Sequence, residues 1–451
     1  MIFFYTHTYH AIRCIPFDFT NRNRRRPSWA SVLFIPFIQQ VAFFSLIIIM
    51  AHVHKLVLKG QTVPISTIQR IIKNNVNQCR KVSTNQGLWA AKTHDENTSS
   101  PVPVGEVKRY ATDCMVSVGV KEDHASALAD VLVAADYRGH YSHGLNRLEM
   151  YVQDIKSKIC DGNAIPTVLK DKYSTALVNG QNSLGPVVGN FCMNLAIEKA
   201  KKHGVGWVAA NNSNHYGIAG WYSMLAANQG LMGLSFTSTS PLVAPTRAKT
   251  ATLGTNPITL AAPALNGDQF VLDMATCTVA VGKIELQRRK GLPIPEGWAI
   301  DTDGKITTSA DVAMKGCLMP LGGAEETSGY KGYGLATLVE IFCGISAGAT
   351  YGPNIRRWMD TKRKADLGQC FIAVDPECFA SGFQTRMSDL MSHLRHMEPA
   401  DPTKPILVAG DPERAHIALV DAEGGIRYHV NQINASAALA EKLKVKPMKH
   451  I

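Results

Sequence analysis

Short apolar runs alternate with helical segments in the middle of the chain, and this alternation constrains the fold more than any other feature. From residue 175 onward the runs are rich in β-forming residues and are separated by Gly and Asn. The runs that predict strands are Thr175–Val178, Gly206–Ala210, Gly233–Thr237, Ile258–Ala261 and Gln269–Leu272. Helical periodicity at Phe191–His203 and Gly220–Asn228 separates some of them. Strands that alternate with helices indicate an α/β domain.

Helical patterns also occur before and after this region. Before it, Val107–Val118 and Asp123–Asp136 predict two helices. After it, the spacing of apolar residues predicts three more, at Tyr333–Gly344, Thr385–Arg395 and Ala437–Leu443. Ser436 precedes the last of these helices, and we expect it to be the N-cap.

The N-terminal part of the chain differs from the rest in charge. Residues 1–105 hold 12 Lys and Arg against 3 Asp and Glu, so they carry +9 of the total net charge of +11. The remainder is nearly neutral, and it lacks the interleaved basic and aromatic residues of a nucleic-acid platform. We therefore expect no nucleic-acid partner.

Three interpretations of the N-terminal extension are open. A mostly apolar run from Ser31 to Ala51 follows four arginines and has about the length of a membrane span, although a proline and two glutamines interrupt it. From Met50 to Lys92 basic residues occur without any acidic residue, which is typical of a mitochondrial presequence. Residues 1–49 can also lie outside the working protein. We expect a cytoplasmic or mitochondrial protein, with membrane contact only if residues 31–51 are retained and insert.

The ten cysteines give no sign of a metal site or of a disulfide framework. They are scattered, with no Cys-x-x-Cys pair and no Cys/His spacing of the zinc-binding kind. We therefore expect no metal, and buried thiols in a reducing compartment.

The segment Gly139–Arg147 carries most of the functional information. It places His143 and Arg147 four residues apart, and apolar residues recur at helical spacing from Leu145 onward. The spacing predicts the first turns of a helix with both side chains on one face. A proton donor beside a guanidinium that binds carboxylate is what the reduction of a 2-oxo acid requires. The alternative is a polar helix start with a solvated Arg147.

Three further segments offer polar groups where strands end. His215 follows a strand in a run of Asn and Ser, and it is either a cleft residue or a turn histidine. Gly254–Pro257 predicts a turn that either holds phosphate or is an ordinary Asn-Pro turn. Asp273 ends an apolar run and can contact a ribose or cap a helix. No Gly-x-Gly-x-x-Gly follows a strand, so spacing alone supports an acid-binding enzyme and not a nicotinamide enzyme.

Together these segments resemble the malate/L-lactate dehydrogenase family of the non-Rossmann type, which includes ureidoglycolate, sulfolactate and diketogulonate oxidoreductases. The resemblance covers the chain from about Pro103 to the C-terminus. The motifs that carry it are Ser142-His143-Gly144 with Arg147, Asn214-His215, Gly254-Thr255-Asn256-Pro257, Asp273-Met274-Ala275, Lys331-Gly332 and Gly410-Asp411-Pro412-Glu413. One departure is Ser238, where the family has Asn; the change is expected to remove one hydrogen bond near the cofactor, worth about 1 kcal/mol.

The resemblance implies a non-Rossmann NAD(P)-binding α/β domain, a mainly helical second domain and a homodimer. It implies that His143 is the acid/base residue, that Arg147 binds the substrate carboxylate, and that His215 is a second site histidine. Ser142 is expected to orient His143. The residues that the resemblance places along the nicotinamide cofactor are Thr239, Asn256, Pro257, Asp273, Met274 and Ala275.

We therefore predict an oxidoreductase that transfers hydride between NAD or NADP and a small 2-hydroxy acid/2-oxo acid pair, malate or lactate first. Four parts are expected: an extension (1–102), a helical substrate segment (103–174), a cofactor domain (175–325) and a return that completes both domains (326–451), with Thr98–Pro103 as the linker into the body. The alternatives are a cyclic imino acid reductase on the same fold and a catalytically silent binding or membrane-tethered protein. Which of the two histidines donates the proton is open.

Overall fold

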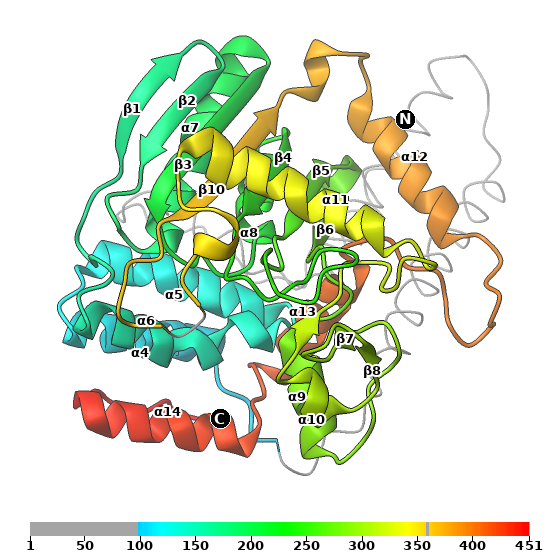
Figure 1. Cartoon of the computed structure of the whole chain (residues 1–451). Helices are drawn as coiled ribbons and strands as arrows, with labels where there is room; N and C mark the ends of the chain where they lie inside the picture. Colours follow the sequence, from blue (N-terminus) through cyan, green and yellow to red (C-terminus); the bar gives the residue numbers. More distant parts are fainter. Residues whose placement is uncertain (1–97, 358–359, 451) are drawn as a thin grey trace, which may run out of the picture. The chain divides into compact units, whose positions relative to one another are not determined.

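A seven-stranded mixed sheet forms the centre of the described chain (Figure 1). The computed structural model describes residues 98–357 and 360–450. In spatial order the strands are β1 (Thr167–Lys172), β2 (Thr175–Asn179), β3 (Val205–Ser213), β10 (Leu367–Val374), β4 (Met232–Thr237), β5 (Ile258–Pro263) and β6 (Gln269–Met274). Within this sheet β2 and β3 pair in parallel, and every other neighbouring pair is antiparallel.

The predicted α/β class is confirmed, and each of the five predicted strands is present. The sequence analysis missed β10, which lies between β3 and β4 although it comes about 130 residues after β4 in the chain. All of its residues except Val374 are buried. A short continuous apolar run of this kind does not show the alternation that marks a half-buried strand, so its pattern does not distinguish a strand from a buried helix.

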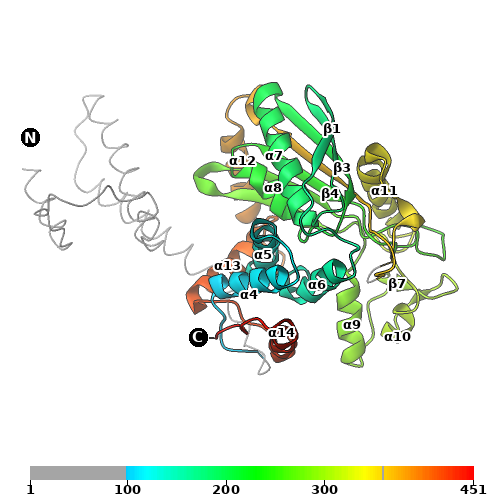
Figure 2. The same cartoon turned by 90° about the vertical axis from the view of Figure 1, so that its left-hand side faces the viewer.

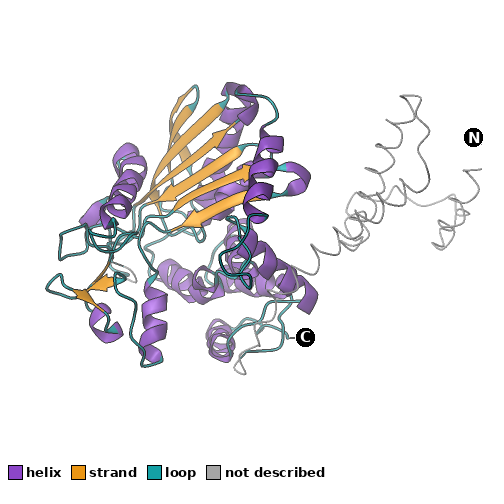
Figure 3. Ribbon diagram, turned by 90° about the vertical axis from the view of Figure 1, so that its right-hand side faces the viewer, coloured by secondary structure: helices purple, strands orange, loops and turns teal. Residues whose placement is uncertain are grey.

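Helices cover both faces of the sheet (Figures 2 and 3). On one face α7 (Gly185–His203) and α8 (Gly220–Ala227) share a core with the side chains of Val178, Val208 and Phe371. On the other face α11 (Gly329–Glu340) and the π-helical turn at Ile341–Ile345 pack on Phe236, Cys370 and Ile372. The sheet is therefore the middle layer of three. A further helix, α12 (Phe383–Arg395), packs beside β5.

A separate group of helices lies below one end of the sheet in Figure 1. Its members are α4 (Val104–Ser117), α5 (Glu122–Tyr137), α6 (Leu148–Lys156) and α14 (Val430–Leu443), with α13 (Asp411–Glu423) beside α5. The prediction that Ser436 caps the last helix was wrong. The helix begins at Val430, where His429 accepts a hydrogen bond from the Asn431 N–H, and Ser436 is buried inside it.

A small lobe beside the sheet has its own core. It contains β7 (Ala299–Ile300), β8 (Ile306–Thr307), β9 (Cys317–Leu318), α9 (Val281–Arg289) and α10 (Ala310–Ala313). Ile284, Ile294 and Ala299 are buried together within it. Because Ile284 comes from α9, this core fixes the position of that helix.

Residues Thr98–Pro103 are not the linker that the sequence predicted. Thr98 forms a bridge with His429, and Val102 exchanges two backbone hydrogen bonds with Ile426, of 2.8 and 2.9 Å. Val102 is fully buried. The boundary after residue 102 therefore stays a prediction, and these contacts favour an earlier one. The expectations for residues 1–97 lie outside the described residues, and within the described part no helix has the length and apolar character needed to span a membrane.

Candidate active site

A cavity of about 430 Å³ opens where the helical group, the strand ends and the small lobe meet. The segment after α5 lines it with Ser142, His143 and Arg147, and the loop between β3 and α8 contributes His215. The first turn of α9 lines another part. Nine of the ten predicted site residues line this one cavity: Ser142, His143, Arg147, His215, Thr239, Pro257, Asp273, Met274 and Ala275. Their individual roles stay predictions.

The segment that carries His143 and Arg147 is not the start of an α-helix. Tyr141–His143 and Leu145–Arg147 form two short 3₁₀ turns, and α6 begins only at Leu148. The helical-face argument was therefore wrong in its geometry, although both side chains reach the cavity. The Arg147 Nε donates a 2.6 Å hydrogen bond to the Ser142 carbonyl, and the Ser142 Oγ lies 2.9 Å from the His143 Nδ1. The bond from Arg147 holds the two turns against each other, and the Ser142 hydroxyl contacts the His143 ring within the first turn.

Asp136, near the end of α5, holds the two 3₁₀ turns in place; together, residues Tyr141–Arg147 are called the double turn below. Its Oδ2 accepts hydrogen bonds of 2.8 Å from the Leu145 N–H and from the Tyr428 hydroxyl. The carboxyl is almost completely buried, and burial raises its pKa to about 7. A Cβ at Gly144 would lie 1.8 Å from the Asp136 Oδ1, so residue 144 has to be glycine for the turn to approach α5 this closely.

Two histidine rings lie next to each other in the cavity. The rings of His143 and His215 are stacked, with centroids 5.9 Å apart and an interplanar angle of 17°. Burial, together with the charges of Arg147 and His140, lowers the pKa of His143 to about 4. Burial also moves the pKa of His215 well below its usual value. Both imidazoles are therefore neutral at pH 7.

Charged groups that sequence reasoning missed also line the cavity. Arg356 pairs with Asp154 at 2.9 Å, and both side chains are nearly buried. His140 lies 3.3 Å from the Glu413 carboxylate, which raises the pKa of His140. No local pattern marks Arg356, because its partner lies 202 residues away in the sequence. A histidine two residues before the Ser-His-Gly motif was a visible signal for His140.

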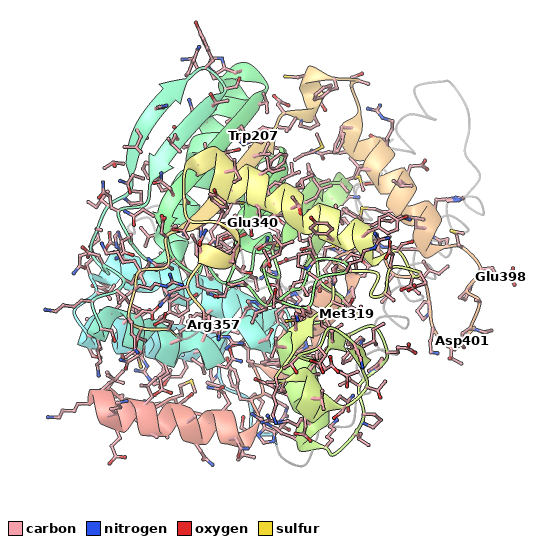
Figure 4. All side chains as sticks on the ribbon, viewed as in Figure 1. Trp207, Met319, Glu340, Arg357, Glu398 and Asp401 are labelled. Carbon is pink, nitrogen blue, oxygen red and sulfur yellow. The ribbon has the colours of Figure 1, made fainter. Side chains whose placement is uncertain are left out.

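Asn256 is the one predicted site residue that does not line the cavity. It is fully buried behind the wall, where its Oδ1 accepts a hydrogen bond from the Thr239 N–H. Its Nδ2 donates a 2.8 Å hydrogen bond to Glu340, which lies at the C-terminal end of α11 (Figure 4). Asn256 therefore connects the loop after β4, the turn before β5 and α11. Its contacts are those of a residue that shapes the wall of the cavity, and its contact with the cofactor stays a prediction.

Asp273 and Ser238 face different surroundings. The Asp273 Oδ2 accepts a 2.7 Å hydrogen bond from the Gly220 N–H at the start of α8, while the side chain also lines the cavity. Ser238 is fully buried and donates to the Gly368 carbonyl on β10. The serine is thus bonded to the sheet, and the expected loss of a cofactor hydrogen bond at this position has no support in its contacts.

Comparisons with known proteins identify relatives of this chain. Residues 102–435 match the family model described as malate/L-lactate dehydrogenase. A malate dehydrogenase of Pyrococcus abyssi is 42% identical over 299 residues, which cover 65% of this chain and 82% of the relative. An L-sulfolactate dehydrogenase of Methanocaldococcus jannaschii is 40% identical over 308 residues, 68% of this chain and 87% of the relative.

A solved structure has the same architecture. The malate dehydrogenase of Pyrococcus horikoshii OT3 superposes with a TM-score of 0.72 at 36% sequence identity. The superposition covers 78% of this chain and 98% of that chain. The cavity therefore belongs to a fold that is used by dehydrogenases of this type.

Proposed function

We propose, on the premise that this chain belongs to the malate/L-lactate dehydrogenase family, that it interconverts a small 2-hydroxy acid and its 2-oxo acid with NAD or NADP, malate or lactate first. One observation carries the proposal. Two neutral histidines and an arginine, His143, His215 and Arg147, converge in one cavity with the residues predicted along the cofactor. The resemblance alone would leave open whether these side chains meet.

The lining of the cavity fits a nicotinamide nucleotide. Asp273 offers carboxylate oxygens, which suit ribose hydroxyls, and Thr239 and Thr255 offer hydroxyl groups. Pro257 and Met274 offer apolar surface suited to a planar ring. When bound, the cofactor would supply or accept the hydride. Nothing in these residues distinguishes NAD from NADP.

Arg147 is the proposed ligand of the substrate carboxylate. A guanidinium binds a carboxylate through two parallel hydrogen bonds, which fixes the direction in which the neighbouring carbon points. The bond from Arg147 to the Ser142 carbonyl holds the guanidinium beside the His143 ring. The carboxylate and the reacting carbon would therefore be held next to an imidazole.

His143 is the proposed proton-transfer group. In the oxidative direction it is already neutral at pH 7, so it can accept the hydroxyl proton. In the reductive direction it must carry a proton. A substrate carboxylate on Arg147 opposes the positive charge that lowers the pKa of His143, so substrate binding raises that pKa. The substrate itself would thus prepare the histidine for reduction.

A homodimer is part of the proposal. The outer side of α11 and of the π-helical turn carries Tyr330, Tyr333, Ile341 and Ile345, each 38% to 51% exposed in the described chain. Large apolar side chains grouped on one surface are typical of a protein interface. We therefore propose that a second copy of the chain, as the family resemblance implies, packs on this surface. Replacing Ile341 and Ile345 with Asp should then lower the mass of the protein measured by light scattering, from that of a dimer to that of a monomer.

The activity is tested with a panel of 2-oxo acids and cyclic imines, each with NADH and with NADPH. Consumption of the reduced cofactor with pyruvate or oxaloacetate supports the proposal. Turnover of cyclic imines alone would favour an imino acid reductase, because the same carboxylate contact serves that substrate. The compartment, cytoplasmic or mitochondrial, is tested by locating the full chain and a chain that lacks residues 1–97.

A further inference from the structure

The Nδ1 atom of His215 has two neighbours that bear on its protonation. The backbone N–H of Gly217 donates a hydrogen bond to it at 3.3 Å, and the hydroxyl of Tyr151 lies 2.5 Å from it. A backbone N–H can donate and never accept. This contact therefore favours a lone pair on Nδ1 and the ring proton on Nε2, but at 3.3 Å it is long, and the shorter contact is the one with Tyr151.

The surroundings of His215 keep this ring neutral. Among the described residues, the titratable and charged groups that act on it besides Tyr151 include His143, Arg147 and Arg356, and each of these three, when charged, is positive. A second proton would have to enter at Nδ1, where it would break the hydrogen bonds from Gly217 and Tyr151. Electrostatics and hydrogen bonding thus favour the same state.

The surroundings of Tyr151 favour a hydroxyl that donates its hydrogen bond to the His215 Nδ1. It is 2% exposed and lies on α6, four residues after Arg147. Burial raises the pKa of its hydroxyl, which therefore keeps its proton. The hydroxyl has one other neighbour, the His215 carbonyl oxygen at 3.4 Å, which can only accept. The contacts with the Gly217 N–H and with the His215 carbonyl oxygen are both consistent with a Tyr151 O–H that donates its hydrogen bond to Nδ1.

We propose that Tyr151 is a positioning residue that fixes the tautomer of His215, so that His215 donates a hydrogen bond from Nε2 to the reacting oxygen and does not act as a base. The inference rests on the proposed oxidoreductase function. As hydride adds to the carbonyl carbon, negative charge develops on the oxygen, and a neutral imidazole N–H stabilises that charge without giving up its proton. The sequence left open which of the two histidines exchanges the proton, and this assignment gives that role to His143.

His143 differs in the contact that its ring makes. Its Nδ1 neighbour is the Ser142 hydroxyl at 2.9 Å, which can donate or accept. Either tautomer of His143 is therefore compatible with this contact, and the ring can exchange a proton. In the oxidative direction His143 would accept the hydroxyl proton, and a bound oxidised nicotinamide would accept the carbon-bound hydrogen with its electron pair. The products would be the 2-oxo acid, the reduced cofactor and protonated His143.

The tautomer is measured directly by ¹⁵N NMR of protein labelled at histidine. We expect the His215 signals to show a protonated Nε2 and an unprotonated Nδ1, unchanged between about pH 5 and 8 because the ring stays neutral. A protonated Nδ1, or a titration in this range, would overturn the proposal. This readout needs no turnover, so it remains decisive if the enzyme acts on none of the 2-oxo acids and the proposed function fails.

Substitutions separate a donor from a base. Gln places an amide N–H near the position of Nε2, so His215→Gln should keep at least about tenfold more turnover than His215→Ala. His143→Gln should be no better than His143→Ala, because an amide cannot transfer the proton. Equal loss in the two His215 variants would contradict the donor role.

Tyr151→Phe tests the positioning residue. It removes the hydroxyl and should lower kcat about tenfold, the value of one hydrogen bond, without moving the acidic limb of the pH profile that belongs to His143. Its NMR spectrum should show both tautomers of His215. Tyr110→Phe is the matched control, since it also removes a buried hydroxyl bond, but one to the Ser436 carbonyl and not to His215. If the tautomer of His215 is unchanged in Tyr151→Phe, the Gly217 N–H alone fixes it, and the positioning role of Tyr151 is wrong.

Discussion

The double turn at Tyr141–Arg147 and the strand ends around Thr255–Ala275 both line the cavity, but they are held in different ways. The double turn belongs to no sheet and depends on Asp136, whose second partner Tyr428 lies 292 residues away in the sequence. The strand ends belong to β5 and β6, which are neighbours in sequence and pair in a regular antiparallel register. The substrate side of the cavity is thus fixed by a few distant side-chain contacts, and the cofactor side by a backbone ladder.

This difference predicts where single substitutions do most harm. Changes in the double turn should affect catalysis strongly and leave cofactor binding almost intact. Changes in the extension outside the described body should affect neither. The following five predictions are ordered from the largest expected effect to the smallest.

Replacement of His143 by Ala should lower kcat by about 100- to 10,000-fold, because it removes the proposed proton-transfer group. Cofactor affinity, measured by nicotinamide fluorescence, should change little, since the strand ends are untouched. A variant that kept more than half of the wild-type turnover would show that His143 is structural. The double turn would then not carry the catalytic group that distinguishes it from the strand ends.

Gly144→Ala should damage the double turn through packing alone. Its new Cβ would lie 1.8 Å from the Asp136 Oδ1, so the turn must move away from α5, at a cost of about 1–3 kcal/mol in stability. We expect kcat to fall at least about tenfold, with cofactor affinity retained. Gly105→Ala is the control, because a Cβ there meets nothing within 4 Å. Full activity in G144A would mean that the turn is not held as tightly as Asp136 suggests.

Arg147→Lys should raise the KM for the 2-oxo acid about tenfold, because a single ammonium cannot reproduce a two-point contact with a carboxylate. The KM for the cofactor should stay within about twofold. Steady-state kinetics with each substrate varied in turn distinguish the two effects. An unchanged KM for both malate and lactate would place this guanidinium outside the substrate site.

The pH dependence of hydroxy-acid oxidation should report His143. Its pKa of about 4 in the free enzyme means that the neutral base is present above that pH and is lost as the pH falls through it. The kcat/KM for oxidation should therefore stay level as the pH falls from 7 to about 5, and then decline. In Arg147→Gln the positive neighbour is gone, so the decline should begin at higher pH. If the acidic limb of the kcat/KM profile does not shift in this variant, it reports the titration of a group other than His143.

The smallest effect should come from shortening the N-terminus. A chain that begins at Ser100 keeps the cavity but loses the hydrogen bond from the Ser99 N–H to the Tyr428 carbonyl and the bridge from Thr98 to His429. We expect full turnover and a loss of about 1–2 kcal/mol in the free energy of unfolding. A chain that begins a few residues earlier should lose nothing. Insolubility of both chains would show that the extension packs on the body.

Local signals explain what the sequence could predict. The strands β2 to β6 follow from apolar runs bounded by Gly and Asn, and the motifs at Ser142–Arg147 and Asp273–Ala275 led to residues that share one cavity. The shape of the double turn did not follow, because the apolar spacing belongs to α6 only from Leu148 onward, while Leu145 lies in the second 3₁₀ turn, and the break at Gly144 depends on Asp136. The apolar spacing correctly predicted α6, but it wrongly predicted that His143 and Arg147 belong to the same helix.

Long-range contacts explain what it could not predict. Tyr151, Asp136 and Arg356 each act on the site through a partner that is distant in sequence, and none of them stands in a distinctive local pattern. Asn256 was visible as part of an Asn-Pro turn, but its buried contact with Glu340 is a property of the packed structure. Such residues become visible only when the elements that carry them have been brought together.

The place of β10 has a consequence for the order of folding. This strand joins β3, which leads into His215, to β4, and it reaches both from the last third of the chain. Until residue 374 has been synthesised, β3 and β4 each present an unpaired edge, and the two parts of the sheet cannot close. A nascent chain that stops short of this strand would expose two edges open to pairing with other chains, so the completed sheet should form late and slowly.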